Sequence, residues 1–62
     1  MKYTHPRNPD KVYYISNGWS GYTQIKEYFK GSPRTKLDVD AIQLKSFKNK
    51  LEENGWIAVD NS

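Results

Sequence analysis

The clearest alternation of apolar and polar positions lies in residues 38–60, which read DVDAIQLKSFKNKLEENGWIAVD. Leu44, Phe47 and Leu51 repeat at i, i+3 and i+7, which places them on one face of an α-helix. The apolar residues at 56–59 then follow directly after Gly55. The pattern predicts an amphipathic helix that runs directly into a short strand.

Both ends of this helix carry capping signals. Asp38 or Asp40 can accept a hydrogen bond from an unpaired backbone N–H at its start. Gly55 lies where a left-handed residue usually ends a helix, and Trp56 follows within reach of Leu51. The sequence therefore predicts a fixed exit angle from the helix into the strand.

A second apolar segment, residues 11–16 (KVYYIS), is rich in β-branched and aromatic residues and is typical of a strand. In a strand, Val12 and Tyr14 would point to one face, and Tyr13 and Ile15 to the other. Because both faces are partly apolar, we expect this strand to be covered on more than one side.

Residues 21–30 are predicted to form another helix of about ten residues, because Tyr22, Ile25 and Phe29 keep the i, i+3, i+7 spacing. The Asn-Gly pair at 17–18 would by itself suggest a two-residue hairpin turn. The helical spacing that follows favours the helix over the hairpin.

These elements predict a small α+β domain over residues 11–62, in the order strand, helix, helix, strand. The two helices would pack on a small two-stranded sheet, whose strands pair within the chain or across a homodimer. Residues 1–10, with two prolines, are expected to be an irregular arm. Residues 32–37 are expected to be a connecting loop.

The composition limits the size of the core and the cellular location that we expect. A chain of 62 residues buries only about 60% of its unfolded surface. It has no cysteine for disulfides, so its nine aromatic residues must supply much of the core. It contains no apolar run long enough to span a membrane, and its start lacks the apolar core of a signal peptide. We expect a cytoplasmic protein without a membrane partner.

Catalytic chemistry has little support in the sequence. His5 is the only histidine, and no nucleophile or carboxylate stands at a telling distance from it. There is no glycine-rich phosphate loop and no metal-ligand spacing. We predict a non-enzymatic protein without a cofactor or metal.

Basic residues provide the main functional signal. The chain has ten Lys and Arg against seven Asp and Glu, a net charge of +3, which suits an anionic partner such as nucleic acid. Arg34 and Lys36 lie in the predicted loop. Lys45 and Lys48 share one shoulder of the long helix. We predict that these four form one phosphate-contacting surface, although a solvated surface without a partner explains the same charges.

The order KVYYIS, GYTQIKEYFK, DVDAIQLKSFKNKLEENG, WIAVD resembles the middle of a winged-helix DNA-binding domain, without its first helix and its second wing strand. The segment LKSFKNKLEENGWIAVD is similar to the recognition helix and first wing strand of that family. The resemblance implies that Lys45, Lys48 and Asn49 lie near the DNA groove and that Arg34 and Lys36 contact phosphates. On this basis we expect a small regulatory nucleic-acid-binding protein.

A protein partner is the alternative. Ile42 stands among polar residues on the outer face of the long helix, and Tyr13 and Trp19 belong to an aromatic group that either fills the core or stays exposed. An apolar patch of Tyr13, Trp19 and Ile42 would indicate a host-protein inhibitor or adaptor of the kind that phages and mobile elements encode.

Overall fold

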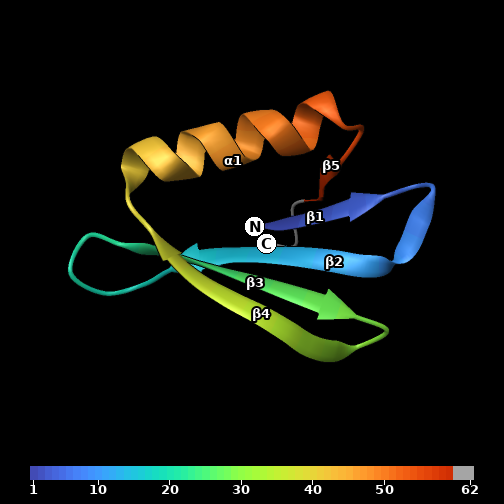
Figure 1. Cartoon of the computed structure of the whole chain (residues 1–62), viewed down its shortest axis with the longest axis horizontal. Coiled ribbons are helices and arrows are strands. Elements are labelled where there is room, and N and C mark those ends of the chain that lie inside the picture. The colour runs from blue at the N-terminus through green and yellow to red at the C-terminus, as the bar shows by residue number, and fades with distance from the viewer. Residues whose placement is uncertain (60–62) are drawn as a thin grey trace.

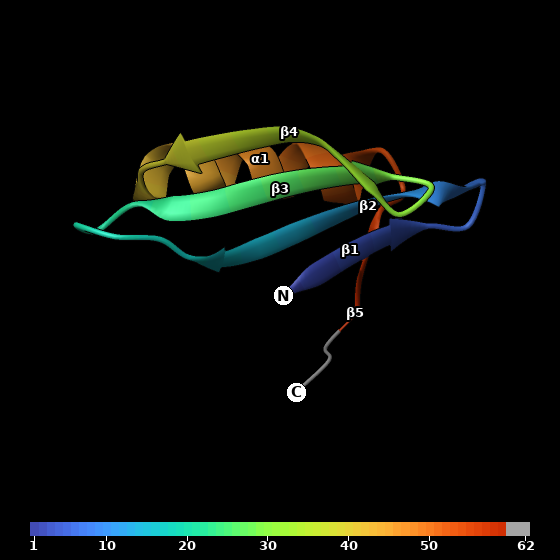
Figure 2. The same ribbon diagram turned by 90° about the horizontal axis from the view of Figure 1, so that it is seen from below.

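A computed structural model describes residues 1–59 as a five-stranded antiparallel sheet with one helix packed on one face (Figure 1). In chain order the elements are β1 (Lys2–His5), β2 (Asn8–Asn17), β3 (Thr23–Phe29), β4 (Ser32–Val39), α1 (Ala41–Glu53) and β5 (Ile57–Val59). Across the sheet the strands follow the order β4-β3-β2-β1-β5. Seen from below, the sheet lies in front of the helix, and no described helix covers that side (Figure 2).

The predicted arrangement of two helices on a two-stranded sheet is wrong. Residues 21–30, expected to be helical, contain β3, which pairs with β2 along its whole length. Ile25 does face the core, but the intervening positions alternate between the two sheet faces instead of following a helical stripe. The helix pair implied by the winged-helix resemblance is therefore absent from residues 1–59.

The two turns that bound β3 explain the error. Lys30 and Gly31 both have positive φ, at 52° and 81°, and link β3 to β4 through a two-residue hairpin turn. At the other end, the hairpin signal at Asn17–Gly18 is real but opens a longer loop, closed by a 3.0 Å hydrogen bond from the Gly18 N–H to the Tyr22 carbonyl. The sequence-based helix prediction gave too little weight to both turns.

The first ten residues form a β-hairpin rather than an irregular arm, because β1 pairs with β2 and β5. Tyr3 on β1 is the most buried large side chain among residues 1–59, at 2% exposure. The His5 ring accepts a hydrogen bond from the Arg7 N–H at Nδ1, 3.0 Å away. Its Nε2 lies 2.8 Å from the Asn54 carbonyl, to which it donates. His5 thus ties the hairpin to the end of α1.

The long helix and the strand that follows it confirm the sequence prediction. Asp40 caps α1, and its carboxylate accepts a 2.8 Å hydrogen bond from the Gln43 N–H. Gly55 has φ of 90°, and the Trp56 N–H donates to the Leu51 carbonyl over 2.9 Å. This Schellman motif turns the chain into β5, as its spacing predicted.

The core lies between α1 and the sheet. Its buried members are Tyr3, Ile15, Ile25, Val39 and Leu51. They come from β1, β2, β3, β4 and α1, so each described element except β5 contributes one buried residue. Tyr13, Leu44, Phe47 and Trp56 pack around them. Ile15 and Tyr13 point toward the helix, so the alternating Tyr14 and Val12 point to the opposite side, which we call the open face.

Candidate nucleic-acid interface

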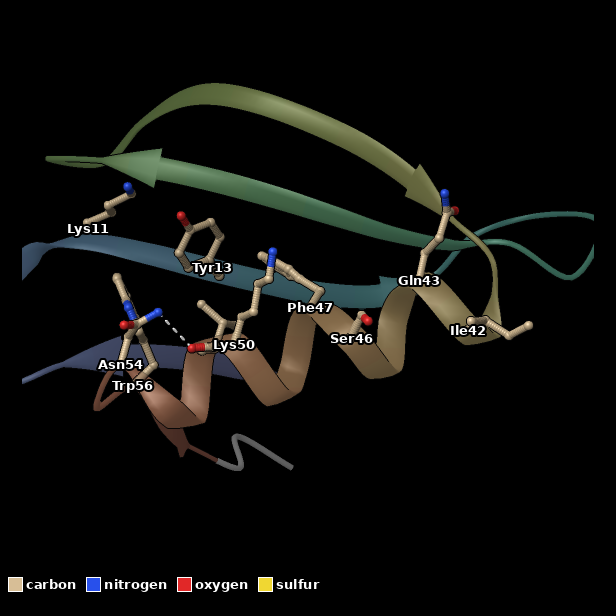
Figure 3. Close-up of a pocket in the computed structure, with 10 residues that line it drawn as sticks. Lys11, Tyr13, Ile42, Gln43, Ser46, Phe47, Lys50, Asn54 and Trp56 are labelled. Carbon is tan, nitrogen blue, oxygen red and sulfur yellow. Dashed lines mark hydrogen bonds between the residues drawn. The ribbon is translucent and has the colours of Figure 1, made fainter.

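One candidate site is a groove of about 550 Å³ between α1 and the sheet (Figure 3). Tyr13 from β2 and Phe47 from α1 lie beside each other in it, with ring centroids 5.3 Å apart in an edge-to-face arrangement. Trp56 packs against the other side of Tyr13 at 4.9 Å. The aromatic rings in this groove are thus part of the packing that holds the helix on the sheet.

The two charged side chains on the sheet side of the groove form a salt bridge with each other. Lys11 Nζ lies 2.9 Å from a Glu27 carboxylate oxygen, which also accepts a 2.9 Å hydrogen bond from the Tyr13 hydroxyl. The hydrogen bond from Lys11 lowers the pKa of Glu27, and the same bond raises the pKa of Lys11. Burial, reinforced by the hydrogen bond to Glu27, raises the pKa of Tyr13. This network leaves the sheet side of the groove nearly neutral.

The open face differs, because a row of cationic and aromatic side chains crosses it. The pairing register runs from Lys36 on β4 through Lys26 on β3 and Tyr14 on β2 to Lys2 on β1. Neighbouring strands lie about 4.8 Å apart, so the row spans about 14 Å. Three cations and one aromatic ring therefore form a continuous line across four strands.

The centre of this row is unfavourable for folding. Lys26 and Lys36 are directly opposite each other on adjacent strands. Like charges in such a pair destabilise a sheet. Lys11–Glu27 is the only salt bridge within residues 1–59, so no described carboxylate forms a salt bridge with these two lysines. Asp38 lies two residues along β4 on the same face and offsets part of the repulsion. Local conflicts of this kind are expected mainly at functional or strained sites.

Tyr14 and Tyr28 provide an aromatic pair on the same face, with ring centroids 5.3 Å apart and planes at 83°. Two shallow hollows lie around them. The first, of about 520 Å³, is lined by Val12, Tyr14, Ser16, Lys26, Tyr28 and Gly31. The second, of about 320 Å³, is lined by Lys26, Tyr28, Pro33, Arg34, Thr35 and Lys36. Lys26 and Tyr28 border both hollows.

The structure divides the predicted phosphate-contacting residues between two sides of the molecule. Arg34 and Lys36 are on β4 and line the second hollow of the open face. Lys45, Lys48 and Asn49 are on α1, which covers the opposite face of the sheet. The two groups therefore do not form the single surface that the sequence analysis predicted.

The alternative set for a protein partner is only partly brought together. Tyr13 and Ile42 both line the groove, although Ile42, in the first turn of α1, is 81% exposed. Trp19 is 70% exposed in the β2–β3 loop and does not line the groove. Trp19 and Ile42 share one end of the molecule, because Thr23 after the loop pairs with Val39 just before the helix.

Sequence reasoning missed Lys2, Lys26 and Tyr28 as members of a surface. Two of them lie in the segment that was predicted to be a helix, and Lys2 lies in the segment predicted to be irregular. The available signal was the alternation at 24, 26 and 28, which places Lys26 and Tyr28 on one face of a strand. Their neighbours across the sheet follow only from the strand order.

Comparison with protein-family models, with curated proteins and with solved structures finds no match to this chain. Residues 1–59 contain no group of three or more His, Cys, Asp or Glu side chains placed to hold a metal ion. In the part of the chain that the structure describes, no helix has the length and apolarity needed to cross a membrane.

Proposed function

We propose that the protein is a small, non-enzymatic nucleic-acid-binding regulator and that it binds through the open face of its sheet. Lys2, Lys26 and Lys36 would contact phosphates, and Arg34 would add a fourth cation at the edge of the second hollow. Each lysine or arginine that neutralises a phosphate releases condensed counterions, which supplies the free energy of binding. This proposal keeps Arg34 and Lys36 from the sequence prediction and replaces the helix residues with sheet residues.

The opposed pair of Lys26 and Lys36 is the observation that carries the proposal. A solvated surface without a partner gains nothing from placing two cations directly across from each other, and the fold loses stability by it. A phosphate between the two ammonium groups would turn this repulsion into attraction. The groove on the helix side has no directly opposed pair of lysines, because Lys11 there has Glu27 as its partner and Lys50 comes from the helix.

A salt titration tests the proposal. Binding of a labelled oligonucleotide is measured by fluorescence anisotropy while the salt concentration rises. If the three lysines of the row and Arg34 contact phosphates, the slope of log K against log salt is about −2.8 on a single strand and about −3.6 on duplex DNA. Replacing Lys26 and Lys36 together by Gln should bring the single-strand slope to about −1.4 and weaken binding at low salt.

The chain offers a matched control in Lys45 and Lys48, which are on α1. Replacing both by Gln removes the same amount of charge from the other side of the molecule. The proposal requires this control to bind almost like the parent. Equal losses in the two double variants would show that only net charge matters, and no binding by the parent at low salt would refute nucleic-acid binding altogether.

A protein partner remains the second candidate, and exposed apolar side chains at one end of the molecule favour it. Trp19 and Ile42 are joined there by Leu37, which faces the helix side yet stays 55% exposed, and by Tyr22. Monomers rarely leave such residues together at the surface without a use for them. If this end binds protein, Trp19→Ser with Ile42→Ser should remove partners that the parent captures from a nuclease-treated lysate. Capture that is identical for parent and variant would exclude this end.

A further inference from the structure

We infer that the open face takes single-stranded nucleic acid and that Tyr14 and Tyr28 stack on its unpaired bases. The inference rests on the proposed function, since the same lysines would hold the backbone. It adds what the lysines alone cannot specify, namely the state of the strand. Phosphate contacts alone do not favour a single strand over the more densely charged duplex, whereas contacts with the faces of unpaired bases do.

The orientation of the two rings favours unpaired bases. Tyr14 and Tyr28 are on adjacent strands, and their planes differ by 83°. Bases inside a duplex are stacked on each other and expose only their edges, so they cannot lie flat on either ring. Two bases stacked on rings in such different planes must also turn relative to each other. A flexible single strand can do this, because its bases can be splayed apart.

The two hollows place a cation beside each ring. Tyr14 and Lys26 border the first hollow, and Tyr28, Lys36 and Arg34 border the second. Lys26 and Tyr28 separate the two hollows and line both. A base in each hollow would therefore have an aromatic face for stacking and a lysine within reach of its phosphate. This repeated combination of ring and cation is how proteins bind single strands without reading their sequence.

Lys2 partly covers the site in the structure. Its ammonium lies 5.8 Å from the centroid of the Tyr14 ring, and Tyr14 is still 39% exposed. Such an exposed cation–π contact corresponds to a factor of about 2–5 in an equilibrium constant. Stacking of one base corresponds to a factor of about 5–150. A base can therefore displace Lys2 from the ring, and the ammonium can then turn to a phosphate.

The test compares three probes of equal length by fluorescence anisotropy. They are oligothymidylate, the same strand annealed to oligoadenylate, and an abasic strand that keeps the phosphates and lacks the bases. We expect the parent to bind oligothymidylate at least 10-fold more tightly than the abasic strand and more tightly than the duplex. Replacing Tyr14 and Tyr28 together by Leu should reduce this preference to near unity, while replacing both by Phe should retain it.

The outcomes separate the inference from the proposed function. Equal binding of all three probes by the parent would overturn the stacking inference and leave phosphate binding intact. Absence of binding to every probe at low salt would overturn both. The ratio of the two single-stranded probes on the parent is decisive even if the Leu variant does not fold, and thermal unfolding followed by circular dichroism monitors that variant.

Discussion

The opposed lysines predict that a change which impairs binding should stabilise the fold. Lys36 faces Lys26 across the β3–β4 ladder. Replacing Lys36 by Gln removes the repulsion, and replacing it by Glu turns the repulsion into attraction. Replacing it by Arg keeps the charge and serves as the control. The expected order of stability is therefore Glu above Gln, and Gln above Arg and the parent.

The magnitude is set by the cross-strand pairing of Lys36 with Lys26. Directly opposed side chains contribute roughly 0.2–1 kcal/mol in proteins, and two unit charges would interact by about 0.7 kcal/mol in water if they stood about 6 Å apart. The Gln variant of Lys36 should therefore gain about 0.5 kcal/mol and the Glu variant about 1 kcal/mol, with Asp38 on the same face reducing both gains. For a domain of this size, 1 kcal/mol raises Tm by about 4–8 °C.

Thermal unfolding at low and high salt provides the measurement. The gain of the Glu variant should be largest at low salt and should nearly vanish in 1 M salt, where the Debye length is about 3 Å. Oligonucleotide binding should weaken in the same order as stability rises. A Glu variant of Lys36 that melts no higher than the Arg variant at low salt would show that the two side chains do not repel, and the main support for the interface would be lost.

Three further predictions concern the fold. Phe47→Ala should lower the free energy of unfolding by about 2–3 kcal/mol. The loss is smaller than for a fully buried ring, because Phe47 is half-buried. A variant with the denaturant midpoint of the parent would contradict the packing role of Phe47. Gly55→Val should destabilise more than Gly55→Asn in thermal melts, because φ is 90° and an added Cβ would lie 3.0 Å from His5 Nε2. Because Lys11 lowers the pKa of Glu27, the parent should lose stability as pH falls below about 4.5. The Glu27→Gln variant has no carboxylate at this position, so its stability should fall less over the same pH range. Equal losses of stability in acid for the two proteins would refute this contribution of Glu27.

The sequence predicted the elements whose signals are local. The cap at Asp40, the apolar spacing of Leu44 and Phe47 and the left-handed end at Gly55 can each be recognised from a few consecutive residues, and the structure confirms them. The strand at residues 11–16 could also be predicted locally, because its composition alone favours an extended chain.

The rest depended on contacts between distant residues. Ile25 fits a helical stripe and a strand alternation equally well, and pairing with Ile15 and Leu37 decides between them. The short β1 carries three polar residues and one buried Tyr3, whose place in the core is fixed only by pairing with β2 and β5. The candidate interface is subject to the same limit, since its row of residues comes from four strands.

Protection of a sheet edge is the strongest competing explanation for the charges on the open face. β4 is an edge strand, and Pro33, Arg34 and Lys36 are the residue types that keep such edges from pairing with other chains. This accounts for Lys36 but not for Lys26, which is on β3 between two paired neighbours and has no edge to protect. The two explanations also differ for Lys36→Glu. A glutamate is also a charged residue that discourages edge pairing, so edge protection predicts little change in solubility and no change in binding. A phosphate site must lose affinity when the sign of this charge is reversed.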